Sequence, residues 1–392
     1  MNSPRDQASA TDAASGSGVD DPALAQGLAR GPLVFDRICL EKVWGGRALE
    51  EVLGIELPGG GPDPRPIGET WELVDRADHQ SVVRSGELAG RTLGELVRDA
   101  PRALLGDARP APNGRFPLLV KFLDASANLS VQVHPDEAGA AAQGAGSEPK
   151  TEAWYFLRDG GAVWCGFDAG VDRARFEAAL ASGAPADLLA HHPVRGGEAL
   201  TVPGGTVHAI GAGVTLLEVQ QNSDTTYRLD DWGRLGLDGR PRELHVRPGL
   251  EVTRFDAPAP RPRAAGEPGA RHGGDPSGDS SGHPAEGERR AAGVERLVDT
   301  AFFRLETLDL APGAAGTFDT AGESGRAFQI LVLVEGSGIV LRPDRDGAAP
   351  TTLATGDLAL VPAALGRFRV EREPTSEGPA RCVCLACPLD RR

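Results

Sequence analysis

The chain has 392 residues, of which 40% are hydrophobic and 25% are charged, a balance typical of a globular protein with room for more than one core. Its formal net charge of −15 argues against nonspecific binding to nucleic acids or to an anionic membrane surface. No apolar run of the chain is long enough to cross a bilayer, the N-terminus is polar, and the number of cysteines is odd. We therefore expect a cytoplasmic protein without a disulfide framework.

Two segments lack the apolar periodicity of a folded core. Residues 1–30 are rich in Ser, Ala, Asp and Gly, and residues 258–293 are rich in Pro, Gly, Ser and Arg. We predict a disordered N-terminal tail and a flexible linker. His272 and His283 lie in the linker and are expected to be solvated. The two segments leave a first domain at 31–257 and a second at 294–392.

The first domain reads as short strands with a few helices. Helices are expected after Thr92, where Glu95 completes a capping box, at 172–180, ended by Gly183, and at 186–192. The strand-like runs are residues 33–44, 68–73, 129–134, 150–156, 206–210 and 216–221, and Lys121 and Phe122 belong to a further strand rich in Leu and Val just before residue 129.

The run at 129–134 has a polar face. Successive side chains of a strand point to opposite sides, so Ser130, Gln132 and His134 share one face and apolar residues occupy the other. A half-exposed strand with polar residues in solvent would show the same pattern.

Three later strands repeat this pattern and favour another interpretation. Lys150 shares a face with Glu152, Thr206 shares a face with His208, and Glu218 shares a face with Gln220. Each strand thus points polar or ionisable groups one way and apolar groups the other. A small antiparallel barrel with a polar pocket in its mouth is predicted.

The second domain is predicted to be all β and to hold no metal. It contains no histidine, and glycines and prolines separate its strand-like runs. Cys382, Cys384 and Cys387 form a C-x-C-x-x-C pattern that could suggest a metal site, but the first two share one strand face and are expected to be small buried hydrophobes. Strands are predicted at 302–310, 327–334, 338–341, 357–361, 368–370 and 381–386.

Four segments carry a resemblance to a known family: QVHPD at 132–136, PKTEAWY at 149–155, VPGGTVHAIGAG at 202–213 and QQNSDTTYRLDDWGR at 220–234. In order and spacing they are similar to those of the type I mannose-6-phosphate isomerases, zinc enzymes of the cupin superfamily. The resemblance extends from about residue 31 to the C-terminus. It implies a mainly β fold with two cupin-like (jelly-roll) barrels and a few short helices on the first.

The resemblance also implies a metal site with one Zn²⁺ per chain, bound by Gln132, His134, Glu152 and His208. The residue types agree with such a site, because one carboxylate, two imidazoles and a neutral amide leave the cation with about one formal positive charge and therefore with Lewis acidity. The adjacent histidines 191–192 match no ligand position of the family.

The implied activity is the interconversion of D-mannose 6-phosphate and D-fructose 6-phosphate through a cis-enediol. Glu218 is the candidate base or proton relay, with a structural carboxylate as the alternative. Arg228 matches the family's active-site arginine, and its planar fork suits a phosphate or an enediolate. Ser130 and Lys150 match positions near the substrate, whereas Arg234 lies where some relatives place a lysine.

Two other functions are compatible with parts of this pattern. A cupin oxygenase would bind Fe(II) with two histidines and a carboxylate, and iron content and oxygen consumption would identify it. A sugar-phosphate-binding regulator would keep the fold without turnover, which an activity assay would reveal. The expected partner is a small sugar phosphate, with no nucleic acid and no membrane, and the chain is expected to be a monomer.

Overall fold

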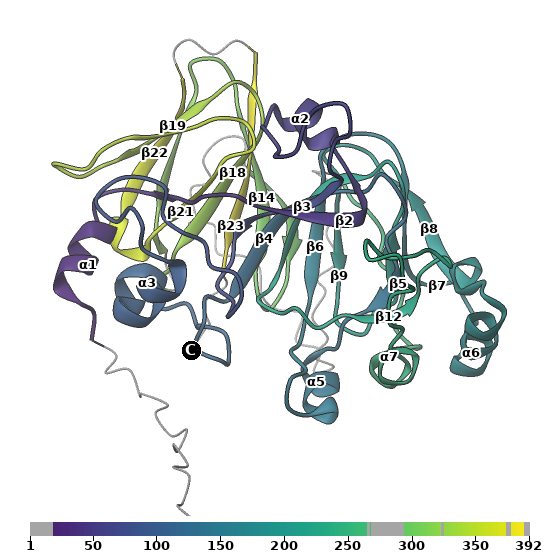
Figure 1. Cartoon of the computed structure of the whole chain (residues 1–392). Coiled ribbons are helices and arrows are strands. Elements are labelled where there is room, and N and C mark those ends of the chain that lie inside the picture. Colours follow the sequence, from purple (N-terminus) through teal and green to yellow (C-terminus); the bar gives the residue numbers. More distant parts are fainter. Residues whose placement is uncertain (1–18, 265–266, 268–293, 323–324, 374–377, 388–392) are drawn as a thin grey trace, which may run out of the picture.

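The structure, a computed structural model, describes residues 19–264, 267, 294–322, 325–373 and 378–387. In that part of the chain strands predominate and the helices are short (Figure 1). The mainly β class predicted from the sequence is therefore confirmed. None of the described helices is both long and apolar enough to cross a membrane.

Two antiparallel sheets form an N-terminal sandwich. The five-stranded sheet has the spatial order β12 (Tyr227–Asp230), β5 (Val131–Val133), β10 (His208–Ile210), β7 (Ala162–Phe167) and β8 (Leu189–Pro193). The six-stranded sheet has the order β2 (Ile38–Gly46), β3 (Ile67–Leu73), β4 (Leu118–Asp124), β11 (Thr215–Gln221), β6 (Glu152–Phe156) and β9 (Ala199–Val202). Trp154 and Phe156 of the second sheet pack with Val163 and Ile210 of the first, so these faces enclose one core.

Two further sheets form a C-terminal sandwich. Its six-stranded sheet has the order β1 (Leu33–Val34), β21 (Leu358–Val361), β18 (Gln329–Glu335), β23 (Ala380–Ala386), β14 (Arg304–Leu310) and β13 (Val294–Asp299). Its four-stranded sheet has the order β15 (Ala315–Asp319), β22 (Arg367–Arg372), β19 (Ile339–Pro343) and β20 (Thr351–Leu353), and a ribbon pairs β16 (Ala321–Gly322) with β17 (Gly325–Arg326). The six strands predicted in this region are confirmed. Closure of either sandwich into a jelly-roll barrel stays a prediction.

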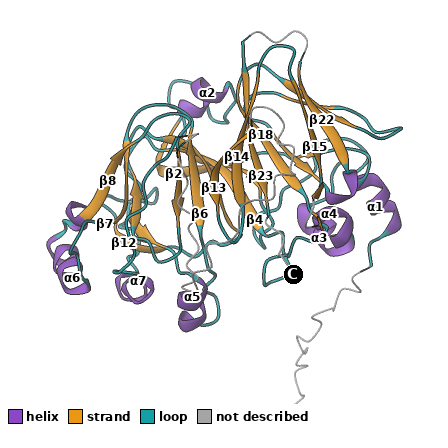
Figure 2. Cartoon of the chain, turned by 180° about the vertical axis from the view of Figure 1, so that it is seen from behind, coloured by secondary structure: helices purple, strands orange, loops and turns teal. Residues whose placement is uncertain are grey.

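The two six-stranded sheets pack against each other through one continuous core. Val120, Tyr155 and Leu217 of the N-terminal sheet share this core with Ile330 and Leu385 of the C-terminal sheet. Figure 2 shows β4 and β6 beside β13, β14 and β23 in the middle of the molecule. Alternation along β6 and β11 therefore turns one set of side chains to this core and the other set into the N-terminal sandwich.

Short helices flank the sheets: α1 (Pro22–Leu28), α2 (Ala48–Leu53), α3 (Leu93–Asp99), α4 (Pro101–Leu105), α5 (Glu137–Gln143), α6 (Arg173–Ser182), α7 (Val246–Val252), and the 3₁₀ turns η1 (Pro185–Leu188) and η2 (Ala363–Leu365). At α3 the predicted capping box is confirmed, because Thr92 and Glu95 each accept the other's backbone N–H. At α6 the predicted stop is confirmed, because Gly183 takes a left-handed conformation with φ of 76°.

The prediction of a disordered tail is wrong for the part that the structure describes. Residues 1–18 lie outside the described residues, but Asp21 caps α1 and Leu24 and Leu28 are buried in the core between the sandwiches. The Asp20 carboxylate accepts hydrogen bonds from two backbone N–H groups at the start of α4. The strand β1 that follows pairs with β21, so residues 33–34, which the prediction assigns to the first domain, belong to a sheet of the second.

The predicted linker starts too early. Arg263 exchanges backbone hydrogen bonds with Ala199 at the edge of β9, so the chain is still part of the N-terminal sandwich there. Most of the remaining linker, including His272 and His283, lies outside the described residues.

The helix predicted at 186–192 is also wrong. The chain forms η1 and then β8, in which His191 and His192 pair with Trp164 and Val163 of β7. Alanines and leucines favour a helix locally, but the open edge of β7 offers ladder hydrogen bonds that outweigh this preference. The two histidines therefore lie at the edge of the five-stranded sheet.

Candidate metal centre and active site

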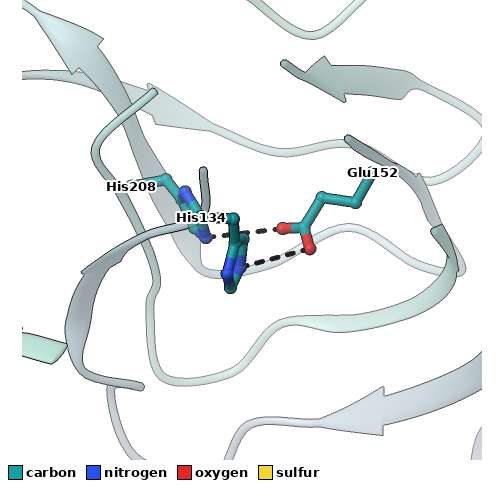
Figure 3. A group of neighbouring side chains, drawn as sticks. All are labelled: His134, Glu152 and His208. Carbon is teal, nitrogen blue, oxygen red and sulfur yellow. Dashed lines mark ion pairs between the residues drawn. The ribbon is translucent and has the colours of Figure 1, made fainter. Parts of the chain in front are cut away.

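Three ionisable side chains converge inside the N-terminal sandwich (Figure 3). His134 follows β5, His208 begins β10 and Glu152 begins β6 in the facing sheet. The Nε2 atoms of His134 and His208 each lie 3.4 Å from a different oxygen of Glu152. All three side chains are buried, and their candidate ligand atoms lie within 4.8 Å of one another.

Backbone carbonyls orient both imidazoles. The Nδ1 atom of His134 lies 2.8 Å from the carbonyl oxygen of Thr225, and that of His208 lies 2.9 Å from the carbonyl oxygen of Thr206. A carbonyl only accepts, so each Nδ1 carries the hydrogen and donates it, and each Nε2 lone pair faces Glu152. Burial lowers the pKa of both histidines, which favours the neutral form that binds metals.

Gln132 lies beside this cluster. It is the direct cross-strand partner of His208, so both side chains point to the same side of the five-stranded sheet. Its amide Nε2 lies 3.2 Å from Nε2 of His208, and its Oε1 accepts a hydrogen bond from the Ser130 hydroxyl at 3.1 Å. Rotation of the amide by 180° brings Oε1, a possible metal ligand, to the His208 side.

Glu152 is a buried carboxylate, and no residue that the structure describes forms a hydrogen bond to either of its oxygens. Burial raises the pKa of Glu152, but the positive neighbours together outweigh burial, so this pKa is lowered; the strongest of these neighbours is Lys150, with Nζ 3.1 Å from one oxygen. Buried polar atoms without partners are rare in proteins. An ionised carboxylate with two such oxygens, facing two imidazole lone pairs, is a donor set that fits a cation such as Zn²⁺.

Glu218 lies next to this cluster on β11. Its Oε1 is 2.9 Å from Nζ of Lys121 and 3.8 Å from Nζ of Lys150, and its Oε2 accepts a hydrogen bond from the indole N–H of Trp154 at 3.1 Å. Burial and the charge of Glu152 raise the pKa of Glu218, and the two lysines oppose this rise. A carboxylate whose pKa is raised is a candidate to exchange a proton with a substrate.

Arg228 extends the row formed by His208 and Gln132. It pairs with Gln132 across β12 and β5, so its side chain points to the same side of the sheet. Its Nη1 donates to the carbonyl oxygen of Glu243 at 2.9 Å, while its buried Nε has no hydrogen-bond partner among the described residues. Burial lowers the pKa of Arg228, and Arg242 adds to that effect. This desolvated guanidinium with a spare donor can bind an anion.

Sequence reasoning missed Lys121 and Glu69 as neighbours of the site. Lys121 was assigned only to a strand, and Glu69 only to the strand-like run at 68–73. Strand alternation between Leu119 and Leu123 could have placed Lys121 on the interior face. Its partners on β11 and β3 could not be found in this way, because they depend on which strands pair.

The cysteines do not form a second metal site. Cys382 and Cys384 pack with the core of the C-terminal sandwich, whereas Cys387 packs into the core between the sandwiches. Burial raises the pKa of all three thiols. In the described parts of the chain, the His134–Glu152–His208 cluster is the one group of three or more such side chains placed to hold a metal.

Known proteins resemble this chain in sequence and in structure. A family model described as the catalytic domain of type I phosphomannose isomerase matches residues 35–153. Mannose-6-phosphate isomerase ManA of Bacillus subtilis is 32% identical over 359 residues, which cover 90% of this chain and 98% of that protein. The Streptococcus mutans mannose-6-phosphate isomerase is 37% identical over 230 residues, 58% of this chain and 69% of that protein. The crystal structure of the Bacillus subtilis mannose 6-phosphate isomerase superposes with a TM-score of 0.72 and 27% identity, over 90% of this chain and 99% of that one. The chain therefore belongs to the type I phosphomannose isomerase family.

Proposed function

We propose that this protein is a zinc-dependent mannose-6-phosphate isomerase that interconverts D-mannose 6-phosphate and D-fructose 6-phosphate. The observation that carries the proposal is the buried set of two imidazole lone pairs and an ionised carboxylate without hydrogen bonds, in a chain 32% identical to ManA over nearly its full length.

The reaction moves one proton and rearranges two bonds. In the open-chain aldose, a base takes the proton from C2 while the C1 carbonyl oxygen gains a proton, which gives the cis-enediol. The proton then returns to C1 as the hydroxyl on C2 loses its hydrogen and becomes the ketone. Glu218 is the proposed base, because its buried carboxylate lies next to the metal cluster and is held by Lys121, Lys150 and Trp154.

Gln132, His134, Glu152 and His208 are the proposed ligands of one Zn²⁺. When bound, this cation would supply a Lewis acid for the oxygens on C1 and C2. The side chains fix the donor atoms in advance, since Thr225 and Thr206 orient the histidines.

Arg228 is proposed to bind the phosphate or the developing negative charge, with Ser130 and Lys150 as further substrate-binding residues. Ser130 lies within hydrogen-bond distance of Gln132, and Lys150 lies 3.3 Å from His134. The three side chains thus lie close to the proposed metal ligands and offer one hydroxyl and two cationic groups.

The test is a coupled assay of mannose 6-phosphate isomerisation before and after a chelator. We expect that removal of the metal abolishes turnover and that Zn²⁺ restores it. Full turnover after verified metal removal would contradict a role for the metal. Iron in the purified protein together with oxygen consumption would instead identify an oxygenase, and sugar-phosphate binding without turnover would identify a regulator.

A further inference from the structure

Two arginines hold one buried aspartate in the connecting segment, residues 231–245, which joins β12 to α7. The carboxylate of Asp231 accepts hydrogen bonds from Nε and Nη2 of Arg234 and from Nε and Nη2 of Arg242. Only 6% of the Asp231 side chain is exposed. Burial raises its pKa, but the two guanidinium groups together outweigh burial and lower this pKa. Asp231 is therefore ionised, and it fixes the two arginines relative to each other.

The connecting segment is also tied to the residues that precede β5. Trp232 and Gly233 both have left-handed φ values, 58° and 67°, so the chain turns sharply there. The indole N–H of Trp232 donates to the carbonyl oxygen of Leu129 at 2.6 Å, and Nη1 of Arg234 donates to that of Asn128. A left-handed conformation is costly for an aromatic residue. The contacts that hold this turn therefore give the segment one defined position.

Arg228 contacts the other end of the connecting segment. Its backbone N–H donates to Nδ1 of His245 at 3.2 Å, and its Nη1 donates to the carbonyl oxygen of Glu243, the residue after Arg242. Burial lowers the pKa of Arg228 most, and among the positive neighbours Arg242 lowers this pKa more than Arg234 does. Arg242 is therefore the positive neighbour that acts most strongly on Arg228.

The two arginines held by Asp231 differ in the donors that they leave unused. Arg234 uses Nε and Nη2 on Asp231 and Nη1 on the carbonyl oxygen of Asn128. Arg242 uses Nε and Nη2 on Asp231, and its Nη1 contacts no acceptor in the described part of the chain. The buried Nε of Arg228 is likewise without a partner there. Unused donors are therefore present on Arg228 and on Arg242.

The charge of this cluster suits a phosphate monoester. The three arginines 228, 234 and 242 against Asp231 leave two formal positive charges, in a chain whose net charge is −15. A phosphate monoester carries about 1.5 to 2 negative charges near neutral pH and binds arginine donors well. Glu243 does not cancel this positive charge, because its side chain is 84% exposed and screened by solvent.

We propose that Arg242 is a second phosphate-binding residue beside Arg228, and that Asp231 is the positioning residue that holds Arg242 in place. The inference rests on the proposed function, because it concerns the phosphate of the same substrate. Arg234 has a structural role, since its donors fix the connecting segment to Asp231 and Asn128.

The first experiment compares Arg242→Met with Arg240→Met in the metal-loaded protein. Arg240→Met is the matched control, because it removes the same charge from an exposed position of the connecting segment. Arg242→Met loses charge-assisted hydrogen bonds to the phosphate. We therefore expect KM for mannose 6-phosphate and Ki for inorganic phosphate, a competitive inhibitor, to rise about tenfold or more. Binding lost equally from substrate and transition state leaves kcat within about threefold, and zinc should stay near one per chain.

Asp231→Asn distinguishes positioning from a plain charge effect by its sign. If Asp231 acted only as a negative charge near the phosphate, its removal would tighten binding and lower both KM and Ki. As a positioning residue it holds Arg242, so we expect its removal to raise both constants by about threefold or more. A purely structural role would lower the free energy of unfolding and leave Ki unchanged.

The proposal is overturned if Arg242→Met changes Ki no more than Arg240→Met, or if Asp231→Asn lowers or preserves Ki. If Asp231→Asn does not fold, Arg234→Met decides in its place, because a rise in Ki equal to that of Arg242→Met would contradict the separate roles. If Arg242→Met does not fold, Arg242→Lys replaces it and should still raise Ki, since it loses the planar fork.

Failure of the proposed function can be recognised separately. A wild-type protein without isomerase turnover would reject that function, whereas calorimetric binding of inorganic phosphate to the same variants requires no turnover. Phosphate binding that weakens in Arg242→Met and Asp231→Asn but not in Arg240→Met would then still support the phosphate site.

Discussion

Glu152 is the residue that contacts both histidines of the candidate metal centre, with one oxygen 3.4 Å from each Nε2. Glu152→Ala leaves two neutral imidazoles and an amide, without the charge that a dication needs. We therefore expect the variant to lose bound metal and turnover together. Metal analysis and the coupled assay on the same sample check this, and retention of one zinc per chain would show that Glu152 is not a ligand.

A substitution of Arg228 distinguishes a role in substrate binding from a role in metal binding. Arg228→Lys keeps a positive charge but loses the planar fork, and Arg228 is not among the proposed ligands. We expect zinc to stay near one per chain and turnover to fall about a hundredfold, comparable to the loss of one preorganised donor. Near-normal kcat and KM in this variant would mean that the phosphate lies elsewhere.

At the scale of single elements, α1 shows how a weak local pattern becomes ordered through distant contacts. Its seven residues include one glycine, one proline and two alanines. So short a helix is only marginally stable by itself. Asp21 accepts hydrogen bonds from two N–H groups of its first turn, and Leu24 and Leu28 reach the core between the sandwiches. Packing therefore stabilises the helix.

Leu28→Ala tests this role of α1. Leu28 is fully buried, so the variant should lower the free energy of unfolding by about 2–4 kcal/mol. Val19→Ala is the matched control, because Val19 is 73% exposed and should change it by less than about 0.5 kcal/mol. Urea denaturation measures both. Equal stability of the two variants would restore the prediction of a disordered tail for this segment.

At the scale of the whole molecule, the core between the two six-stranded sheets makes the sandwiches depend on each other. All five tryptophans lie at or before residue 232, in the N-terminal part of the chain. Tryptophan fluorescence therefore reports on the N-terminal sandwich alone, although the sheets of both sandwiches share apolar contacts.

Phe368→Ala tests this coupling. Phe368 is fully buried in the core of the C-terminal sandwich, and the buried residues of that core include no tryptophan. The truncation should cost about 3–5 kcal/mol. Because the two sandwiches share an apolar core, we expect them to unfold together, and the truncation should then lower the midpoint of the tryptophan-detected transition. A midpoint unchanged from the wild type would show that the N-terminal sandwich unfolds independently.

By itself, the sequence determined the features that depend on near neighbours in the chain. Strand alternation correctly placed Gln132 on one face with His134, and the spacing of Thr92 and Glu95 predicted the capping box that begins α3. The four family motifs implied a set of four metal ligands, and three of them, His134, Glu152 and His208, converge in the structure.

Only the tertiary structure decided which strands pair and which faces are covered. It placed Lys121 opposite Glu218, joined β1 to β21 across more than half of the chain, and turned the stretch at 186–192 from a local helix preference into an edge strand. These outcomes depend on hydrogen-bond ladders and apolar contacts between residues far apart in sequence. Side-chain period and local propensity contain no information about such partners, because both arise within a few residues of the chain.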